Sequence, residues 1–138
     1  MGDVTATSSI LDRYLGYYKA LLQHGISFQE DWIIKDRDED GKFIQLLLPK
    51  EMPQAFVCNC DEIAYHLVEQ LKAAGYRVPE DVSVVGFDDF IYASVCNPQL
   101  TTFRISQEMM AETAVDALAR KMTDSTYHAC LGSSREVV

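Results

Sequence analysis

With 138 residues, the chain has the length of a single domain, and 48% of these residues are hydrophobic, which is enough for a packed core. The formal net charge of −9 would repel phosphate backbones, so the chain itself is not expected to bind DNA or RNA. No apolar run reaches the roughly 18 residues of a membrane span, and the start lacks the pattern of a signal peptide. Four cysteines are too few for a disulfide framework, which favours reduced thiols and a cytoplasmic location.

The first predicted element is a helix over residues 9–24, with Thr7, Ser8 or Ser9 as its cap. Apolar side chains recur at helical spacing in two adjacent rows and form a broad stripe, which indicates a helix packed against a sheet. The rows are Ile10, Tyr14, Tyr17 and Leu21, and Leu11, Leu15, Tyr18 and Leu22. Gly25 is expected to end the helix.

Two short elements are predicted on either side of an acidic loop. A strand is expected at residues 31–35 and a short helix at 43–48, which should end before Pro49. Between them, DRDEDGK at 36–42 begins like a calcium loop but lacks its twelfth-place glutamate, where Leu47 falls, so a solvated loop is favoured.

A strand–helix–strand unit occupies the centre of the chain. Residues 55–59 indicate a buried strand, Asp61 the cap of a helix over 62–73, and Gly75 the end of that helix. The β-branched run at 82–86 is typical of a strand buried on both faces of a parallel sheet. Such a unit is a right-handed crossover almost by rule, so an α/β fold with a parallel sheet is predicted.

The rest of the chain predicts an irregular segment at 91–99, a strand at 100–105 and a final helix at 107–122 capped by Ser106. The tail at 123–138 is polar, and its last residues are a candidate strand.

Two acidic residues and an arginine are the first candidates for a binding site. Asp88 and Asp89 follow a predicted strand, at the sheet edge where α/β proteins bind ligands, and are either ligand acceptors or turn caps. Arg13 lies beside the apolar stripe; it can grip vicinal hydroxyls or a carboxylate, but periodicity alone favours an exposed arginine paired with a neighbour.

Cys58, Cys60 and His66 make a metal site conceivable, but buried cysteines are favoured because no second paired-cysteine motif exists. The sequence also shows no nucleophile–base order and no phosphate-cradling glycine loop. We therefore predict no metal, no cofactor and no enzymatic activity.

Several spaced motifs, in order, resemble one known family. PQAFVCNCDEIAYHLVEQLKAAGYRVPEDVSVVGFDDF, followed by NPQLTTFRIS, resembles the effector-binding core of bacterial regulators of the lactose/galactose repressor family. DRYLG at 12–16, with Tyr17 and Tyr18, resembles that family's first helix of the same region. The resemblance covers about residues 2–122. It implies one half of a type I periplasmic-binding-protein-like fold, in which two Rossmann-like halves clamp a small molecule, often a sugar or nucleobase.

The resemblance implies that the chain is part of a larger regulator. Residues 1–122 would be a partial effector-binding domain, mainly its C-terminal subdomain, and 123–138 a tail. The helix at 107–122 would return to a missing half, and the strand expected directly before Gly2 is absent. We therefore expect a fragment that self-associates to cover the apolar face of this helix.

The resemblance also assigns the site. Arg13 matches the effector-contacting arginine and Asp88 the ligand-contacting carboxylate, while Asp89 would be structural. The family's usual asparagine falls on Cys60, with Asn59 one place earlier, so either the ligand differs or Asn59 substitutes through a local bulge. In the family, a residue in this part of the chain sometimes lines the ligand cleft. Here Trp32, Asp36 and Asp38 are the candidates, and insertions prevent a ranking of the three.

The helix at 62–73 and the segment at 91–99 match places where the family forms two-fold dimers. The candidate interface residues are Tyr65, His66, Glu69, Tyr92 and Val95; the alternative is plain surface or local packing. The resulting expectation is an effector-sensing, dimerising portion of a regulator that reaches DNA through another domain and uses no membrane. A solute-binding protein of the same fold and, further off, a hydrolase or metal enzyme are the alternatives.

Overall fold

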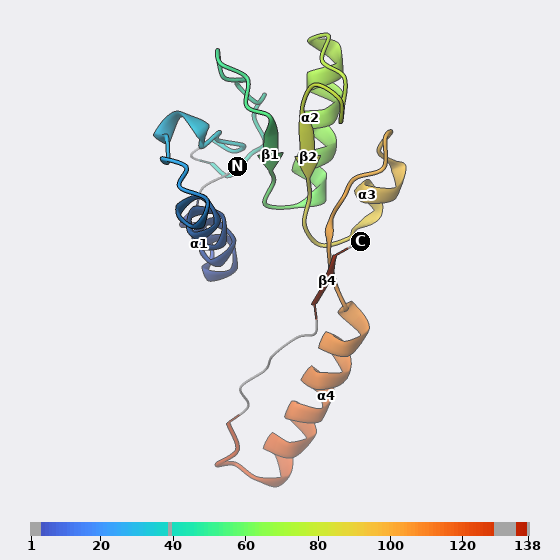
Figure 1. Cartoon of the computed structure of the whole chain (residues 1–138). Helices are drawn as coiled ribbons and strands as arrows, with labels where there is room; N and C mark the ends of the chain where they lie inside the picture. Colours follow the sequence, from blue (N-terminus) through green and yellow to red (C-terminus); the bar gives the residue numbers. More distant parts are fainter. Residues whose placement is uncertain (1–3, 39, 129–134, 138) are drawn as a thin grey trace.

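The computed structural model describes residues 4–38, 40–128 and 135–137. Its centre is the expected crossover: β1 (Ala55–Val57) pairs in parallel with β2 (Ser83–Val85), and α2 (Asp61–Ala73) joins them (Figure 1). In this register Phe56 lies opposite Val84. The predicted α/β class with a parallel sheet is therefore confirmed.

The sheet continues past β2 through the segment that contains β3 (Phe103–Ile105). Parallel bridges join Val85 to Thr101 and Asp88 to Arg104. On its other side β3 pairs antiparallel with β4 (Arg135–Val137), so the candidate strand in the tail is confirmed. All of the parallel segments end at one edge, which is the place where such sheets bind ligands.

The core lies between α2 and the sheet. The five apolar positions of α2 are buried, and they pack with buried residues of the strands: Ile63, Ala64, Leu67, Val68 and Leu71, with Phe56, Val82 and Val84. Each of the larger side chains stabilises the fold by about 1.5–3 kcal/mol through burial.

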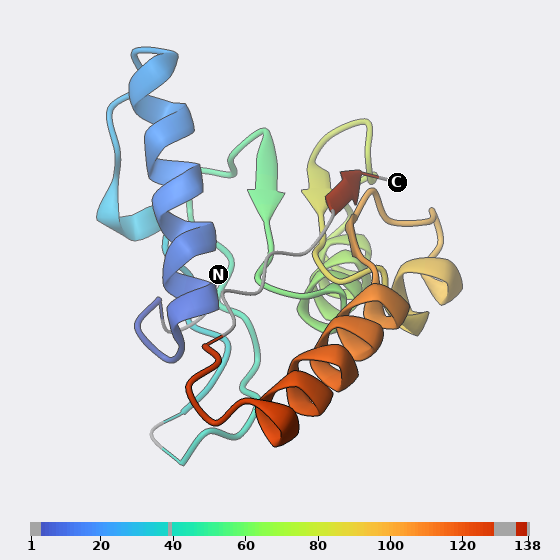
Figure 2. The same ribbon diagram turned by 90° about the horizontal axis from the view of Figure 1, so that it is seen from below.

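The helix α1 (Ser8–Gln23) lies beside β1 in both views (Figures 1 and 2). The Thr7 side chain accepts a hydrogen bond from the Ile10 amide at 3.2 Å and so caps it, and Gly25 follows with a φ of 68°. Among the described residues of α1 none is fully buried, because a cavity separates its apolar stripe from β1.

Two local predictions were wrong. The expected strand at 31–35 is instead a 3-10 turn, η1 (Glu30–Trp32), and the expected helix at 43–48 has no helical turn. Asp38 explains the second error, because its Oδ1 accepts hydrogen bonds from the Asp40 and Lys42 amides and turns the chain back on itself. The Ile44 amide then bonds to the Asp36 carbonyl across this turn rather than within a helix.

The last helix, α4 (Gln107–Thr123), extends away from the sheet (Figure 1). As predicted, Ser106 caps it, accepting a hydrogen bond from the Met109 amide at 3.2 Å. The segment expected to be irregular contains a short helix, α3 (Ile91–Val95), which packs against α2. Within the described residues, no helix is both long and apolar enough to cross a bilayer.

Candidate functional site

The site is built on the ends of β1 and β2, and we call residues 59–61 and 87–89 the rim. Asp61, fully buried, holds the rim together: its Oδ1 accepts from the Thr102 hydroxyl at 2.6 Å and its Oδ2 from the Phe90 amide at 2.7 Å. The prediction that Asp61 caps α2 was wrong, since Cys60 is the N-cap residue and Asp61 is the first residue of the helix. Its carboxylate instead bonds to donors from later segments.

Gly86 is required by the position of Asp61. A Cβ atom at residue 86 would lie 2.1 Å from the Asp61 Oδ1, which no real contact permits. The glycine of the VVGFDD motif therefore leaves room for the buried carboxylate.

Beyond Gly86 the backbone is strained. Asp88 and Asp89 have φ values of 107° and 55°, in a region that residues with a side chain rarely occupy. The two carboxylates then diverge. Asp89 pairs with the Nε of Arg104 at 2.5 Å, while Asp88 faces Arg13. Strain of this kind persists where surrounding contacts hold it, and it concentrates at functional sites.

Arg13 reaches the rim from α1 and makes several contacts there. One guanidinium nitrogen, Nη1, donates to the Asn59 carbonyl at 3.0 Å, and Nη2 lies 3.6 Å from the Asp88 Oδ1. The guanidinium carbon lies 3.7 Å from the centre of the Phe87 ring, which in turn stacks on Phe103 at 5.0 Å. The structure thus brings together Arg13, Asp88 and Asn59, all of which the sequence had singled out.

Burial raises the pKa of the Asp88 carboxyl, and Asp61 raises it further, while the charge of Arg13 acts in the opposite direction. Both side chains of the pair keep some exposure, 23% for Arg13 and 37% for Asp88. The pair is therefore partly desolvated yet still open to a ligand.

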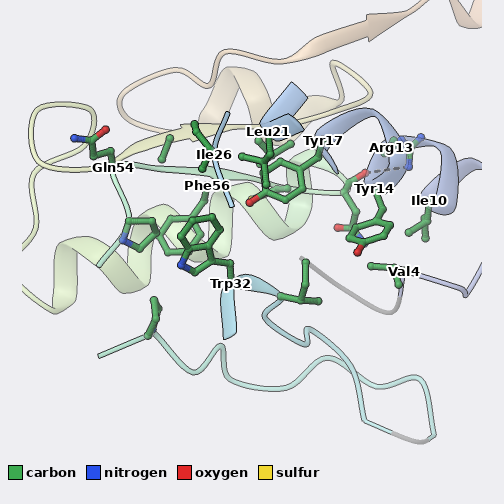
Figure 3. A pocket seen from close by; sticks show the side chains of 17 residues that line it. Val4, Ile10, Arg13, Tyr14, Tyr17, Leu21, Ile26, Trp32, Gln54 and Phe56 are labelled. Carbon is green, nitrogen blue, oxygen red and sulfur yellow. Dashed lines mark hydrogen bonds between the residues drawn. The ribbon is translucent and has the colours of Figure 1, made fainter. Parts of the chain in front are cut away.

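Two cavities adjoin the rim. The first, of about 450 Å³, lies between α1 and β1; Arg13 and Asn59 line its polar end, and Tyr14, Tyr17 and Trp32 are among its aromatic walls (Figure 3). Volumes of this size suit small-molecule ligands.

The second cavity, of about 360 Å³, has Cys60 and Asp88 on one side and Gln107 and Met110 of α4 on the other. The ion pair of Arg13 and Asp88 thus lies between the two cavities, since Arg13 lines the first and Asp88 the second. Asn59 lines the first cavity and Cys60 the second.

Sequence reasoning missed one residue at this site and left a second one unranked. Phe87 supports the Arg13 guanidinium, and only its place between the strand glycine and Asp88 could have pointed to it. Asp36 is 1% exposed, and its Oδ2 accepts from the Asn59 amide nitrogen at 3.4 Å. Sequence reasoning had named Asp36 only together with Trp32 and Asp38, without ranking the three.

The residues suggested for a dimer interface lie on the outer faces of α2 and α3. The rings of Tyr65, His66 and Tyr92 form one cluster with centroids 5.5–6.5 Å apart. Glu69 pairs with Lys72 at 3.2 Å, and Val95 is 58% exposed. His66 thus belongs to an aromatic cluster, and no metal-binding group of three or more His, Cys, Asp or Glu occurs in the described part of the chain.

Residues 2–131 match the family model described as the periplasmic binding protein-like domain. The chain belongs to this family.

Curated relatives of this periplasmic binding protein-like chain are transcriptional repressors. It is 31% identical over 124 residues to the repressor PurR of Photobacterium profundum, covering 87% of this chain and 37% of that protein. It is 35% identical over 118 residues to the arabinose metabolism repressor of Geobacillus stearothermophilus, covering 78% and 32%. The chain thus spans about a third of the length of the curated relatives it matches.

Among solved structures, a sugar-binding regulator of the LacI family from Escherichia coli, complexed with phosphate, matches with a TM-score of 0.69 and 26% identity. The match covers 99% of this chain and 50% of that one. The predicted membership of the lactose/galactose repressor family is therefore confirmed, together with the fold that it implied.

Proposed function

We propose that this chain is the effector-sensing and dimerising portion of a LacI-type transcriptional regulator, and that its rim binds a small sugar-like molecule. The observation that supports this most is the convergence of Arg13 and Asp88 between two cavities at the carboxyl ends of the parallel strands. The regulator would act in the cytoplasm, by binding rather than catalysis, and would contact DNA through a domain outside this chain.

The Arg13–Asp88 pair suits a ligand with both donors and acceptors. At 3.6 Å the two groups attract but are too far apart for a hydrogen bond, so a hydroxyl can bridge them from one side, accepting from Arg13 and donating to Asp88. Phe87 holds the guanidinium in place by a cation–π contact. A ligand that prefers one arrangement of the rim would then shift the regulator between two states.

The dimer is assigned to the outer face of α2 and α3. This face carries a continuous aromatic cluster, together with the ion pair of Glu69 and Lys72. Aromatic side chains are enriched in the centres of such interfaces.

The test is calorimetric titration of the chain with a panel of sugars and nucleosides, using Arg13→Gln and Asp88→Asn. We expect each variant to lose about 1–3 kcal/mol of binding free energy, because each removes a hydrogen bond to a charged group. Arg77→Gln, which changes an exposed arginine in the turn before β2, at the opposite end of that strand from the rim, is the control and should bind as the wild type does. Unchanged affinity in both rim variants would remove them from the site.

A further inference from the structure

Three polar atoms near the rim have no hydrogen-bond partner within the described residues: the Arg13 Nε, the Asp36 Oδ1 and the Asn59 Oδ1. They belong to one network, since Arg13 donates to the Asn59 carbonyl and the Asn59 side chain donates to Asp36. The side chain of Asp36 is almost wholly buried, with 1% of its surface exposed.

Such an arrangement is costly for the protein. A buried carboxylate normally accepts several hydrogen bonds. Among the residues that the structure describes, the Asp36 side chain accepts one, from Asn59, and its length of 3.4 Å is beyond the usual range. A buried group left in this state calls for a partner that arrives from outside. Two of the unpaired atoms are acceptors, so that partner must supply hydrogen-bond donors.

We propose that Asp36 and Asn59 form an acceptor subsite that binds the hydroxyl donors of a polyhydroxyl ligand held at the rim. This rests on the function proposed above and makes Asp36 a specificity-determining residue. Arg13 and Asn59 both line the first cavity, so a ligand there can approach the network from its polar end (Figure 3). The ligand would replace the long hydrogen bond from Asn59 to Asp36, which is the weakest hydrogen bond of this network.

The subsite also defines what the rim should reject. An anion such as phosphate brings mainly acceptor oxygens, and it would meet the carboxylate of Asp88 beside Arg13 and the unpaired acceptors of Asp36 and Asn59. A polyhydroxyl ligand brings both donors and acceptors, so it can satisfy both kinds of unpaired atom.

Asp36→Asn separates a binding role from a structural one. An asparagine at 36 can accept from the Asn59 amide nitrogen and donate to the Asn59 Oδ1, which would complete the buried network without a ligand. We therefore expect the unliganded variant to melt at the same temperature as the wild type or higher, while its affinity for the sugar falls about tenfold or more. A purely structural Asp36 would give the opposite result, with a lower melting temperature and unchanged affinity.

The experiment measures melting temperature and calorimetric affinity with cellobiose, glucose, sucrose and inorganic phosphate. Asp40→Asn, an exposed change in the same loop, is the matched control. Asn59→Ala, which removes the second acceptor, is the backup if Asp36→Asn does not fold. The proposal is supported if the wild type and Asp40→Asn bind at least one of the sugars and Asp36→Asn binds it at least tenfold more weakly. It is overturned if Asp36→Asn binds the sugar equally well, which would leave only water at the subsite, or if phosphate binds better than the sugars. Failure of the wild type to bind any sugar would instead contradict the sugar-sensing function itself.

Discussion

Asp61 joins three segments of chain at the rim, and its carboxylate has no exposed surface. Because both oxygens accept from fixed donors, the negative charge is compensated where solvent cannot reach it. Nothing in the local sequence distinguishes this residue from an ordinary helix cap, since its partners are set by the tertiary fold.

Replacing Asp61 by alanine should lower the free energy of unfolding by about 3 kcal/mol, because the Thr102 hydroxyl and the Phe90 amide would be left buried without an acceptor. Urea titration measures this. Asp116→Ala, on the exposed surface of α4, is the control and should change stability by less than about 0.5 kcal/mol. Equal effects from both changes would contradict the role of Asp61.

Gly86→Ala should destabilise the chain by about 2–4 kcal/mol, because the new methyl group would overlap the Asp61 Oδ1. The same change made in the Asp61→Ala background should cost much less, since the obstructing carboxylate is gone. A double-mutant cycle in urea measures this coupling, and strictly additive effects would show that the steric conflict is not the cause.

Arg77 and Asp81 give a pH-dependent contribution at the surface. The hydrogen bond from Arg77 lowers the pKa of Asp81 from 3.8 to about 2. A depressed pKa means that the pair stabilises the fold above pH 4 and that this contribution is lost as the pH falls from about 4 to about 2. Arg77→Gln should therefore melt slightly below the wild type at pH 7, and the two melting curves should converge near pH 2. A gap that persists unchanged to pH 2 would contradict this assignment.

At the scale of elements, α2 contributes buried side chains to the core, while α1 and α4 contribute none among the residues that the structure describes. All five apolar positions of α2 are buried, whereas within the described residues of α1 and α4 none is. The difference follows from neighbours rather than from sequence pattern, because all three helices have an apolar stripe.

Leu67→Ala, in α2, should lower the free energy of unfolding by about 3 kcal/mol, since a fully buried leucine leaves a cavity behind. Leu118→Ala makes the same chemical change in α4, where the leucine is 65% exposed, and should cost well under 1 kcal/mol. Chemical denaturation of both variants tests the contrast. A similar loss in Leu118→Ala would mean that its face is covered in solution.

The sequence predicted the long helices to within two residues because their caps and stripes are local. Thr7 and Ser106 bond to the amides at the starts of α1 and α4, as capping residues do. The elements at 31–35 and 43–48 failed for the opposite reason: an Asp38 turn and pairing across it decide the backbone there, and periodicity in a short apolar run does not reveal such pairing.

For the candidate site, the sequence indicated Arg13 and Asp88 through the resembled family, and the fold brings them within 3.6 Å. It could not predict the contact of Phe87 with Arg13, and it could not rank Asp36 among its neighbours, since both depend on how distant segments meet. The roles of the named residues stay predictions until ligand binding is measured.

At the scale of the whole molecule, one face of α4 is an exposed apolar surface that includes Leu118 and Met122, which is 87% exposed. Surfaces of this kind usually mark an interaction. We expect the chain to self-associate through this face, and light scattering should show a mass above that of a monomer that rises with concentration. Leu118→Glu should lower the average mass by removing the contact through α4, and Ala119→Glu, on a neighbouring exposed position, should not. A monomer at all concentrations would contradict this expectation.

The contacts of Asp61 also bear on how the chain is made. Its two partners lie 29 and 41 residues later in the sequence. During synthesis, which proceeds at about 5–20 residues per second, this carboxylate therefore waits several seconds before Thr102 emerges. The nascent crossover must stay hydrated over that interval, so the rim closes only after its last strand leaves the ribosome.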